Sequence, residues 1–261
     1  MNESGWWERA KERRARRAIE RQLDYQVRKA GAIRGQEGAM SNAMRASSEG
    51  VRDRLAAVRP ITAAARVLEV GSGAHGLIFS FEGRLRIGID PLAVEYSRLF
   101  PWQGRARTIA AFGERLPFRS GAFDVVLCDN VVDHAEDPRK IIEEMARVLA
   151  PGGLLYFTVN VHHPVYGLAS DLHGMWNAVG LRLEISAFAD HTTHLTPGAA
   201  RQLFDAMPLR LLSSSTNISE ASRRARLLAP RHAGDLLKRV FFKNALFETI
   251  AVKSALELGT A

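Results

Sequence analysis

The segment that decides the fold is an apolar strand followed at once by a glycine-rich loop, Arg66-Val67-Leu68-Glu69-Val70-Gly71-Ser72-Gly73-Ala74-His75-Gly76. The loop has the spacing G-x-G-x-x-G, and the acid Asp90 follows roughly 20 residues after the first glycine. Glycines let the backbone turn tightly and approach a ligand, and an acid at the end of the next strand accepts hydrogen bonds from two ribose hydroxyls. The segment therefore predicts a site for an adenosine-containing cofactor.

Two details favour a methyl donor over NAD in this site. Only a short stretch separates Gly76 from the next expected strand at 85–89, so the helix after the loop is too short to offer a pyrophosphate a strong helix dipole. Glu69 lies at the carboxyl end of the first strand, where an acid suits a cofactor with an ammonium and a sulfonium.

Strands and helices alternate along the middle of the chain. We expect strands at 66–70, 85–89, 123–128, 154–159, 209–215 and 246–253, and helices over 138–149 and 196–207. Thr196 and Pro197 have the residue types of a helix N-cap and first position. This alternation predicts an α/β fold, a Rossmann-like, doubly wound, mainly parallel seven-stranded sheet with an N-terminal helical lid and a helical insertion before the last strand.

The chain divides in two at about residue 50. Residues 1–50 are expected to hold a basic helix over 5–30 and a loop or lid over 31–50, rich in Gly, Ser and small residues. Residues 51–261 are expected to form one domain, and a helix expected over 48–58 crosses its start. Its insertions at 161–190 and 216–242 would shape the site of the second substrate.

The chain is basic, with 36 Lys and Arg against 28 Asp and Glu, for a net charge of +8. The positive charge gathers between Arg9 and Arg21 and again between Arg223 and Arg239. Such clusters attract phosphate groups, although solvated helix faces have the same composition. The single Cys128 cannot form an internal disulfide, and no apolar run reaches the ~20 residues that span a bilayer, so we expect a cytoplasmic protein.

Downstream of the glycine loop, the sequence resembles the class I S-adenosylmethionine-dependent methyltransferases, in particular those with the type 11 methyltransferase domain. The blocks that carry the resemblance, in order, are 67–73, 88–90, 113–118, 123–126, His134 with Asp137-Pro138, and 146–153. Each block alone is a weak signal. Together, in register from about Arg66 to Asn160, they form a strong one.

The resemblance implies the cofactor S-adenosylmethionine, with S-adenosylhomocysteine as product, and a role for each matching residue. Glu69 and the backbone of Gly71, Ser72 and Gly73 would face the methionine end. The ribose, adenine and reactive methyl group would be bordered in turn by Asp90 with Pro91, by Phe112, Gly113 and Glu114, and by Asp129, Asn130 and Val131. Phe112 stands where such proteins often carry an acid, which implies that adenine stacks on Phe112. His75 replaces a common small residue of the loop.

A hydroxyl acceptor would need a general base, and histidine is the usual choice near neutral pH. The candidates are His191, His163, His162 and His134, and they compete with the interpretation that each is structural. Asp190 precedes His191 and is a candidate to orient it. No pair of histidines has zinc-site spacing with Cys or Glu partners, so no metal is expected.

The expected activity is methyl transfer to an oxygen of a small molecule, a sugar, or a glycan- or lipid-linked or natural-product acceptor. An RNA methyltransferase, an NAD-dependent Rossmann enzyme and a non-catalytic binding protein are the alternatives. The basic N-terminal helix with Trp6 and Trp7 suits peripheral contact with an anionic membrane. Nucleic acid is a less favoured partner than these, because the sequence has no RNA motif with interleaved aromatic residues. A homodimer is a further possible assembly.

Overall fold

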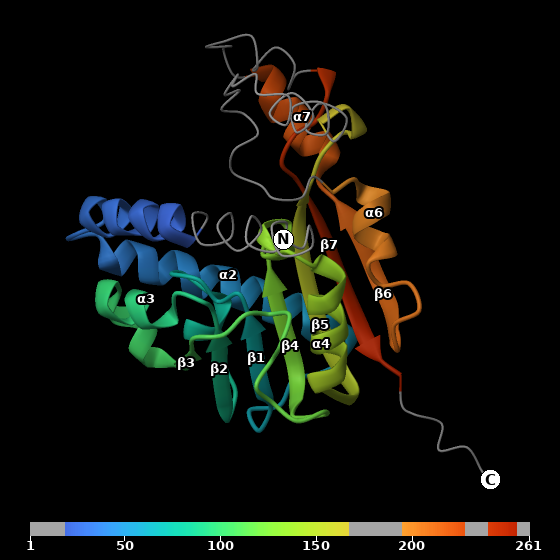
Figure 1. The fold of residues 1–261 in the computed structure, drawn as a ribbon, viewed down its shortest axis with the longest axis horizontal. Helices are drawn as coiled ribbons and strands as arrows, with labels where there is room; N and C mark the ends of the chain where they lie inside the picture. Colours follow the sequence, from blue (N-terminus) through green and yellow to red (C-terminus); the bar gives the residue numbers. More distant parts are fainter. Residues whose placement is uncertain (1–18, 167–194, 228–239, 255–261) are drawn as a thin grey trace, which may run out of the picture.

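A computed structural model describes residues 19–166, 195–227 and 240–254, which form a seven-stranded sheet with helices on both faces (Figure 1). The strands are β1 (Arg66–Val70), β2 (Leu85–Ile89), β3 (Arg107–Ile109), β4 (Phe123–Asp129), β5 (Leu149–Val161), β6 (Leu209–Thr216) and β7 (Ala245–Lys253). They lie in the order β3-β2-β1-β4-β5-β7-β6. The predicted α/β fold is confirmed, and β3 is a strand that the sequence pattern did not predict.

The first five strands of the chain pair in parallel, whereas β7 is antiparallel to both β5 and β6. The sheet is therefore mixed, with a parallel part that carries the glycine loop. Strand order reverses between β1 and β4, because β2 and β3 lie on one side of β1 and β4 and β5 on the other. Ligands of open α/β sheets bind at such a reversal, outside the carboxyl ends of the strands.

The helical elements are α2 (Glu37–Val58), η1 (Leu77–Phe79), α3 (Ala93–Leu99), η2 (Pro101–Arg105), η3 (Val132–His134), α4 (Pro138–Val148), α6 (Pro197–Gln202) and α7 (Ile218–Leu227), with a further helix over 19–32. Thr196 caps α6 as predicted, because its hydroxyl accepts a hydrogen bond from the amide of Ala199 at 3.1 Å. Asp137 caps α4 in the same way by accepting from the amide of Lys140 at 3.0 Å.

The loop predicted over 31–50 is wrong, because α2 begins at Glu37 and takes in most of that segment. The segment is rich in small residues, which favour a loop. The prediction overlooked that some of its residues recur at helical spacing and can form one buried face of a helix. Met44, Ser48, Val51 and Leu55 recur at helical spacing and are all buried against the rest of the fold. Most of the segment expected as a loop or lid is therefore part of a helix packed on the sheet.

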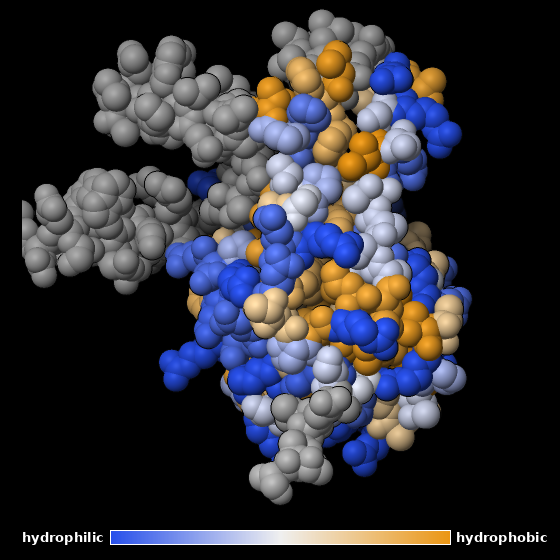
Figure 2. All heavy atoms as spheres, turned by 90° about the vertical axis from the view of Figure 1, so that its right-hand side faces the viewer, coloured by the Kyte–Doolittle hydropathy of each residue, from blue (hydrophilic) through white to orange (hydrophobic). Residues whose placement is uncertain are grey.

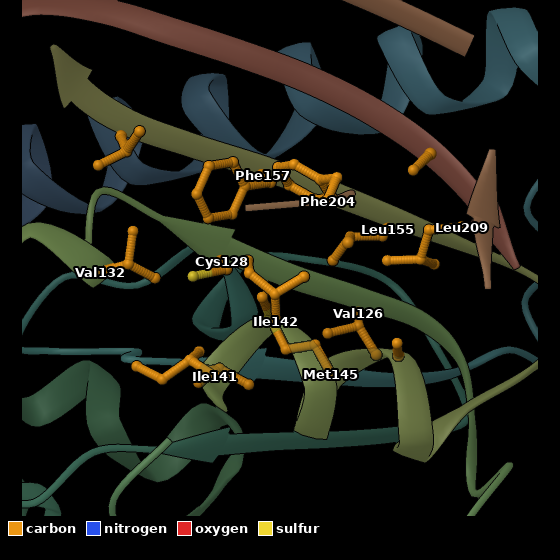
Figure 3. Packing of buried hydrophobic residues seen from close by; sticks show 14 of the residues in the cluster. Val126, Cys128, Val132, Ile141, Ile142, Met145, Leu155, Phe157, Phe204 and Leu209 are labelled. Carbon is orange, nitrogen blue, oxygen red and sulfur yellow. The ribbon is translucent and has the colours of Figure 1, made fainter. Parts of the chain in front are cut away.

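Two apolar cores lie on the two faces of the sheet. On one face, α4 and α6 pack on the central strands, and Figure 3 shows Ile142 and Met145 of α4 pointing at Val126 of β4. On the other face, α2, α3 and η2 pack on the same strands, and Trp102 is among the largest fully buried side chains there. Burial on both faces holds the carboxyl ends of β1, β2 and β4 at one edge.

Residues 228–239, and all but the first few residues of the 161–190 insertion, fall outside the described residues, as do Trp6 and Trp7. The 216–242 insertion begins with α7, which lies above the ends of β5, β6 and β7 in Figure 1. None of the helices in the described ranges has the length and apolar character that crossing a membrane requires.

Candidate functional site

The glycine loop packs against Val131, the second residue after β4. Gly71 has a φ of +72°, and a methyl group added to it would lie 2.3 Å from Cγ2 of Val131. Both the backbone conformation and the contact therefore require glycine at this position. Gly76 is restricted in a similar way, because its methyl group would lie 2.4 Å from the carbonyl oxygen of Ser72. Close contacts thus require glycine near both ends of the loop, at Gly71 and at Gly76.

Asp90, at the end of β2, is joined to the loop by its carboxylate. Oδ2 accepts a hydrogen bond from the amide of Gly73 at 3.0 Å, and Oδ1 accepts one from the amide of Leu92 at 2.8 Å. Partial burial is the main cause that raises the pKa of Asp90. Each carboxylate oxygen has a second lone pair, so Asp90 keeps the capacity to accept from two ribose hydroxyls.

Glu69 lies beneath the loop and is only 1% exposed. Its carboxylate accepts hydrogen bonds from the amides of Leu77 at 3.1 Å and Ile78 at 2.8 Å, which fix the start of η1. Burial raises the pKa of Glu69 to about 8, and the charges of Asp129 and Asp90 add to that rise. Glu69 is therefore largely protonated near pH 7, and a positive ligand above the loop would favour its ionised form.

Asp129 ends β4 at the same edge of the sheet, and Asn130 follows it. The hydroxyl of Thr158 on β5 donates to Oδ1 of the exposed Asp129. Asn130 has a φ of +57°, and its amide donates to both oxygens of Thr158, at 3.0 and 3.1 Å. The Asn130 side-chain oxygen accepts from the amide of Asn160 at 2.9 Å. One β5 threonine thus sets the orientation of both residues.

The segment predicted to border adenine, residues 112–114, lies in the loop that follows β3. Phe112 is 54% exposed, which leaves a large part of its ring open to a stacking partner. Gly113 packs so closely that an added methyl group would lie 3.0 Å from Val70 and 3.1 Å from Ile141. Glu114 is half-buried. The structure thus brings this segment to the same sheet edge as the other predicted cofactor residues.

Two residues that were not predicted from the sequence stabilise the glycine loop through hydrogen bonds. Nε1 of Trp102 donates to the carbonyl oxygen of Ala74 at 2.7 Å. Nε2 of Gln103 donates to the carbonyl oxygens of Gly73 at 3.0 Å and Ala74 at 3.2 Å. Both residues belong to η2, far from the loop in sequence, and no local pattern marks a tryptophan or glutamine as a loop support.

His75 is half-buried, and its ring packs against aromatic residues near η2. Its ring centroid lies 4.9 Å from that of Phe100 and 5.3 Å from that of Trp102. Burial lowers the pKa of His75 to about 4, so the imidazole is neutral at pH 7. His75 therefore adds no positive charge to the glycine loop at that pH.

The structure describes the side chains of only two of the four histidines predicted as bases, His162 and His163. His191 falls outside the described residues, and His134 lies on η3 with its side chain outside them. His162 is 1% exposed, and its Nδ1 accepts from the amide of Asn244 at 3.3 Å. His163 packs between Phe241 and Phe242, at ring distances of 4.8 and 5.6 Å.

The tautomers of His162 and His163 follow from their hydrogen bonds. Nδ1 of His163 accepts from the amide of Val165 at 3.3 Å, as Nδ1 of His162 does from its own partner. A neutral ring whose Nδ1 accepts carries its proton on Nε2, so both rings are arranged as donors. A role as base at Nε2 would require these hydrogen bonds to open first.

The charge of the site is negative. Glu69, Asp90 and Asp129 lie at the ends of three adjacent strands, and the charges of the latter two both raise the pKa of the first. This arrangement fits a cofactor that carries an ammonium and a sulfonium, and it repels a pyrophosphate. In the part of the chain that the structure describes, no group of three or more His, Cys, Asp or Glu side chains is placed to hold a metal ion.

Comparison with known proteins agrees with this geometry. Residues 68–157 match the family model described as a methyltransferase domain. An uncharacterized methyltransferase of Mycobacterium sp. (strain JLS) is 36% identical over 97 residues, which cover 36% of this chain and 38% of that protein. The ubiquinone biosynthesis O-methyltransferase of Xanthomonas oryzae pv. oryzae is 33% identical over 116 residues, which cover 41% of this chain and 48% of that protein. The chain thus spans less than half the length of these two relatives.

Among solved structures, the geranyl diphosphate C-methyltransferase of Streptomyces coelicolor A3(2), in complex with Mg²⁺, geranyl diphosphate and S-adenosyl-L-homocysteine, has the same fold. The TM-score is 0.56 at 15% identity, and the alignment covers 80% of this chain and 79% of that one. Residues 68–157 are therefore similar to a methyltransferase domain, and the fold is that of solved methyltransferase structures.

Proposed function

We propose that the protein is an S-adenosylmethionine-dependent methyltransferase that methylates an oxygen of a small-molecule, sugar, glycolipid or natural-product acceptor. The observation that carries the proposal is the placement of Glu69, Asp90 and Asp129 around the glycine loop. When bound, S-adenosylmethionine supplies a methyl group activated by the positive sulfonium. The chain's own residues supply a negative site that holds this cation in a fixed orientation.

The same geometry is unfavourable for NAD. The element after the loop, η1, is a single 3-10 turn, Leu77–Phe79, so it has no extended helix dipole to offer a pyrophosphate. The carboxylates of Asp90 and Asp129 would repel the phosphates. An adenosine cofactor that carries positive charge needs no helix dipole and is attracted by both carboxylates.

The choice of oxygen as the acceptor atom rests on the similarity to the Xanthomonas O-methyltransferase. A hydroxyl acceptor must lose its proton during transfer, so a base is needed beside it. His191 and His134 keep that role as predictions, and His163 would take it only after its Nδ1 hydrogen bond opens. Exclusion of water from the acceptor would fall to the insertions on either side of β6.

Calorimetry on the full chain tests the cofactor, with S-adenosylhomocysteine and NAD as the two probes. We expect micromolar binding of S-adenosylhomocysteine and no binding of NAD. Binding of NAD alone would overturn the proposal. Once an acceptor is found, His163→Ala and His191→Ala are compared for turnover, and loss of rate in neither variant would remove both histidines from the reaction.

A further inference from the structure

The carboxylate of Asp129 is held at one oxygen and open at the other. Thr158, which is fully buried on β5, donates its hydroxyl hydrogen to Oδ1. No residue in the described ranges donates a hydrogen bond to Oδ2, and Asp129 is exposed at the end of β4. Since each carboxylate oxygen has two lone pairs, Oδ2 is available to a hydroxyl group of a bound molecule.

Asp129 belongs to a row of polar side chains that crosses the sheet. The row consists of paired residues on four adjacent strands, Asp129, Thr158, Glu248 and Ser215. Paired residues of neighbouring strands point to the same face of a sheet, so the four side chains lie side by side. The row is exposed at both ends, and Figure 2 shows the β6 side of the molecule, where pale, weakly polar side chains lie above an apolar patch. An acceptor at Asp129 can therefore extend along polar side chains to the surface.

The two acids of this row have different surroundings. Oε2 of Glu248 accepts a hydrogen bond from the Tyr156 hydroxyl at 2.7 Å and pairs with Arg54 of α2 at 3.3 Å. Asp129 forms no ion pair with a lysine, arginine or histidine of the part of the chain that the structure describes. Two carboxylates in unlike environments can take separate roles in one site. Asp129 is the acid of the row whose charge and open oxygen are both left for a ligand.

Asp129 lies beside the loop that would hold the methionine end of the cofactor. Leu127 pairs with Glu69 of β1, and side chains two residues apart on a strand share a face. Asp129 is therefore on the same face as Glu69 and about 7 Å further along the strand direction. Val131, two residues after Asp129, packs against Gly71, the first glycine of the loop. The open oxygen would thus lie next to the sulfonium methyl group of a cofactor bound over this loop.

The turn after β4 fixes the direction of the Asp129 carboxylate. Asn130 has a φ of +57°, and its amide donates to the hydroxyl oxygen of Thr158 at 3.0 Å. A hydroxyl has one hydrogen to give, and that of Thr158 goes to Asp129. The side-chain oxygen of Asn130 accepts from the amide of Asn160 at 2.9 Å, which holds the turn against β5. Left-handed residues other than glycine persist only where several contacts hold them, and they cluster at functional sites.

We propose that Asp129 is a catalytic residue that accepts the hydrogen of the acceptor's hydroxyl group, and that Thr158 is its positioning residue. The proposal rests on the proposed methyltransferase function. As the acceptor oxygen bonds to the methyl carbon, the carbon–sulfur bond breaks, and its electron pair stays on the sulfur, which becomes neutral. The proton of the hydroxyl passes to Oδ2 of Asp129 and then to water. Unlike His162 and His163, Asp129 needs no existing hydrogen bond to open first.

Sinefungin tests the placement of Asp129 without an acceptor. This analogue of S-adenosylmethionine carries an amino group, protonated at neutral pH, on a carbon that replaces the methylated sulfur. Calorimetry on the full chain measures the affinities for sinefungin and for S-adenosylhomocysteine. We expect Asp129→Asn to weaken sinefungin at least about 10-fold, through loss of a charge-assisted hydrogen bond, and S-adenosylhomocysteine less than about 3-fold. Equal changes for the two ligands, or no change for either, would overturn the proposal.

Glu248→Gln is the matched control, because it removes an acid from the same row about 10 Å away. It should change both affinities less than about 3-fold, because its charge is paired and screened. A loss of sinefungin affinity equal to that in Asp129→Asn would show a general effect of negative charge and overturn the placement.

Two substitutions of Thr158 test its positioning role. Thr158→Val keeps nearly the same shape without the hydroxyl and should weaken sinefungin at least about 3-fold, with a smaller effect on S-adenosylhomocysteine. Thr158→Ser keeps the hydroxyl and should restore the affinity for sinefungin. Equal affinities for sinefungin in the valine variant and the wild type would remove Thr158 from the proposal.

Turnover separates a role of Asp129 in the reaction from a role in binding. With the hydroxyl acceptor of the wild type, kcat of Asp129→Asn should fall at least about 100-fold, which is the usual contribution of a general base. An unchanged kcat would overturn the catalytic role. If the wild type binds neither sinefungin nor S-adenosylhomocysteine, the methyltransferase function itself fails. If it binds both and Asp129→Asn binds them equally well, only the role of Asp129 fails.

Discussion

The carboxylate of Asp90 accepts a hydrogen bond from the amide of Gly73 at 3.0 Å, which joins the end of β2 to the loop that follows β1. Because this contact is made within the chain itself, the acid is oriented before a ligand arrives. A carboxylate held in this way binds ribose hydroxyls without first losing its own rotational freedom.

Replacement of Asp90 by alanine should lower the affinity for S-adenosylhomocysteine at least about 10-fold, through the loss of charge-assisted hydrogen bonds worth about 1.5 kcal/mol or more each. Calorimetry on the purified variant measures the change. Asp53→Asn, at an exposed position of α2, removes an acid away from the loop and should leave the affinity unchanged. An unaltered affinity in Asp90→Ala would show that the ribose lies elsewhere.

The buried Glu69 makes folding stability depend on pH. Its pKa is raised in the folded protein to about 8 from an ordinary value of 4.5, so the folded state holds more protons than the unfolded state between these two values. Its contribution to stability is therefore fully present below about pH 4.5 and is lost as the pH rises to about 8. The difference in Tm between the wild type and Glu69→Gln should shift across that range in favour of the variant.

Binding of S-adenosylmethionine should release protons for the same reason. A positive charge above the loop lowers the pKa of Glu69, which then ionises near pH 7. Calorimetry in two buffers with different ionisation enthalpies measures the number of protons released. Glu69→Gln serves as the control, because a glutamine has no proton to release. Equal release from both proteins would assign the proton to another group.

The contact between Gly71 and Val131 predicts a coupled pair of substitutions. Gly71→Ala should destabilise the fold by about 2–4 kcal/mol, from an overpacked contact and a left-handed backbone. Val131→Ala removes the atoms that the new methyl group would meet at 2.3 Å, so the double variant should regain part of the loss. Urea unfolding of the four proteins measures the coupling, and strict additivity would mean that the two residues do not meet.

Trp102 supports the loop through one hydrogen bond, which Trp102→Phe removes while keeping an aromatic ring. The bond to Ala74 is buried, so its loss should cost about 1–3 kcal/mol of stability. The stacking with Phe100, at 5.3 Å and 22°, should largely persist. Affinity for S-adenosylhomocysteine should fall together with stability, because the carbonyl it held belongs to the glycine loop. A variant with full stability and full affinity would show that the loop needs no such support.

The gathering of the predicted cofactor residues at one edge of the sheet could be predicted from the sequence, because they lie at or just after the ends of neighbouring parallel strands, whereas their contact with a cofactor stays a prediction. An apolar run that ends in glycine or an acid marks such a position locally, as at Gly71, Asp90 and Asp129. The fold followed from the same alternation. The supports of the site, Trp102 and Gln103, could not be predicted, because their contacts join segments far apart in the chain.

Other features of the structure were predicted wrongly or not at all from the sequence, for different reasons. The segment 31–50 contains Gly, Ser and Ala, which local preference assigns to a loop, but burial of Met44, Ser48, Val51 and Leu55 on the sheet outweighs that preference. The strand β3 is only three residues long, Arg107–Ile109, and is too short to show a hydrophobic period. The tautomers of His162 and His163 depend on backbone amides that no sequence motif marks.

The position of β7 also determines when the sheet can close during synthesis of the chain. β7, the last strand in chain order among the described residues, lies between β5 and β6 and pairs with both. While the chain is being synthesised, β6 has no sheet partner, and β5 keeps an open edge. The final closure of the sheet therefore waits until residues 245–253 have left the ribosome, and a chain cut short before Ala245 would present two unpaired strand edges to its neighbours.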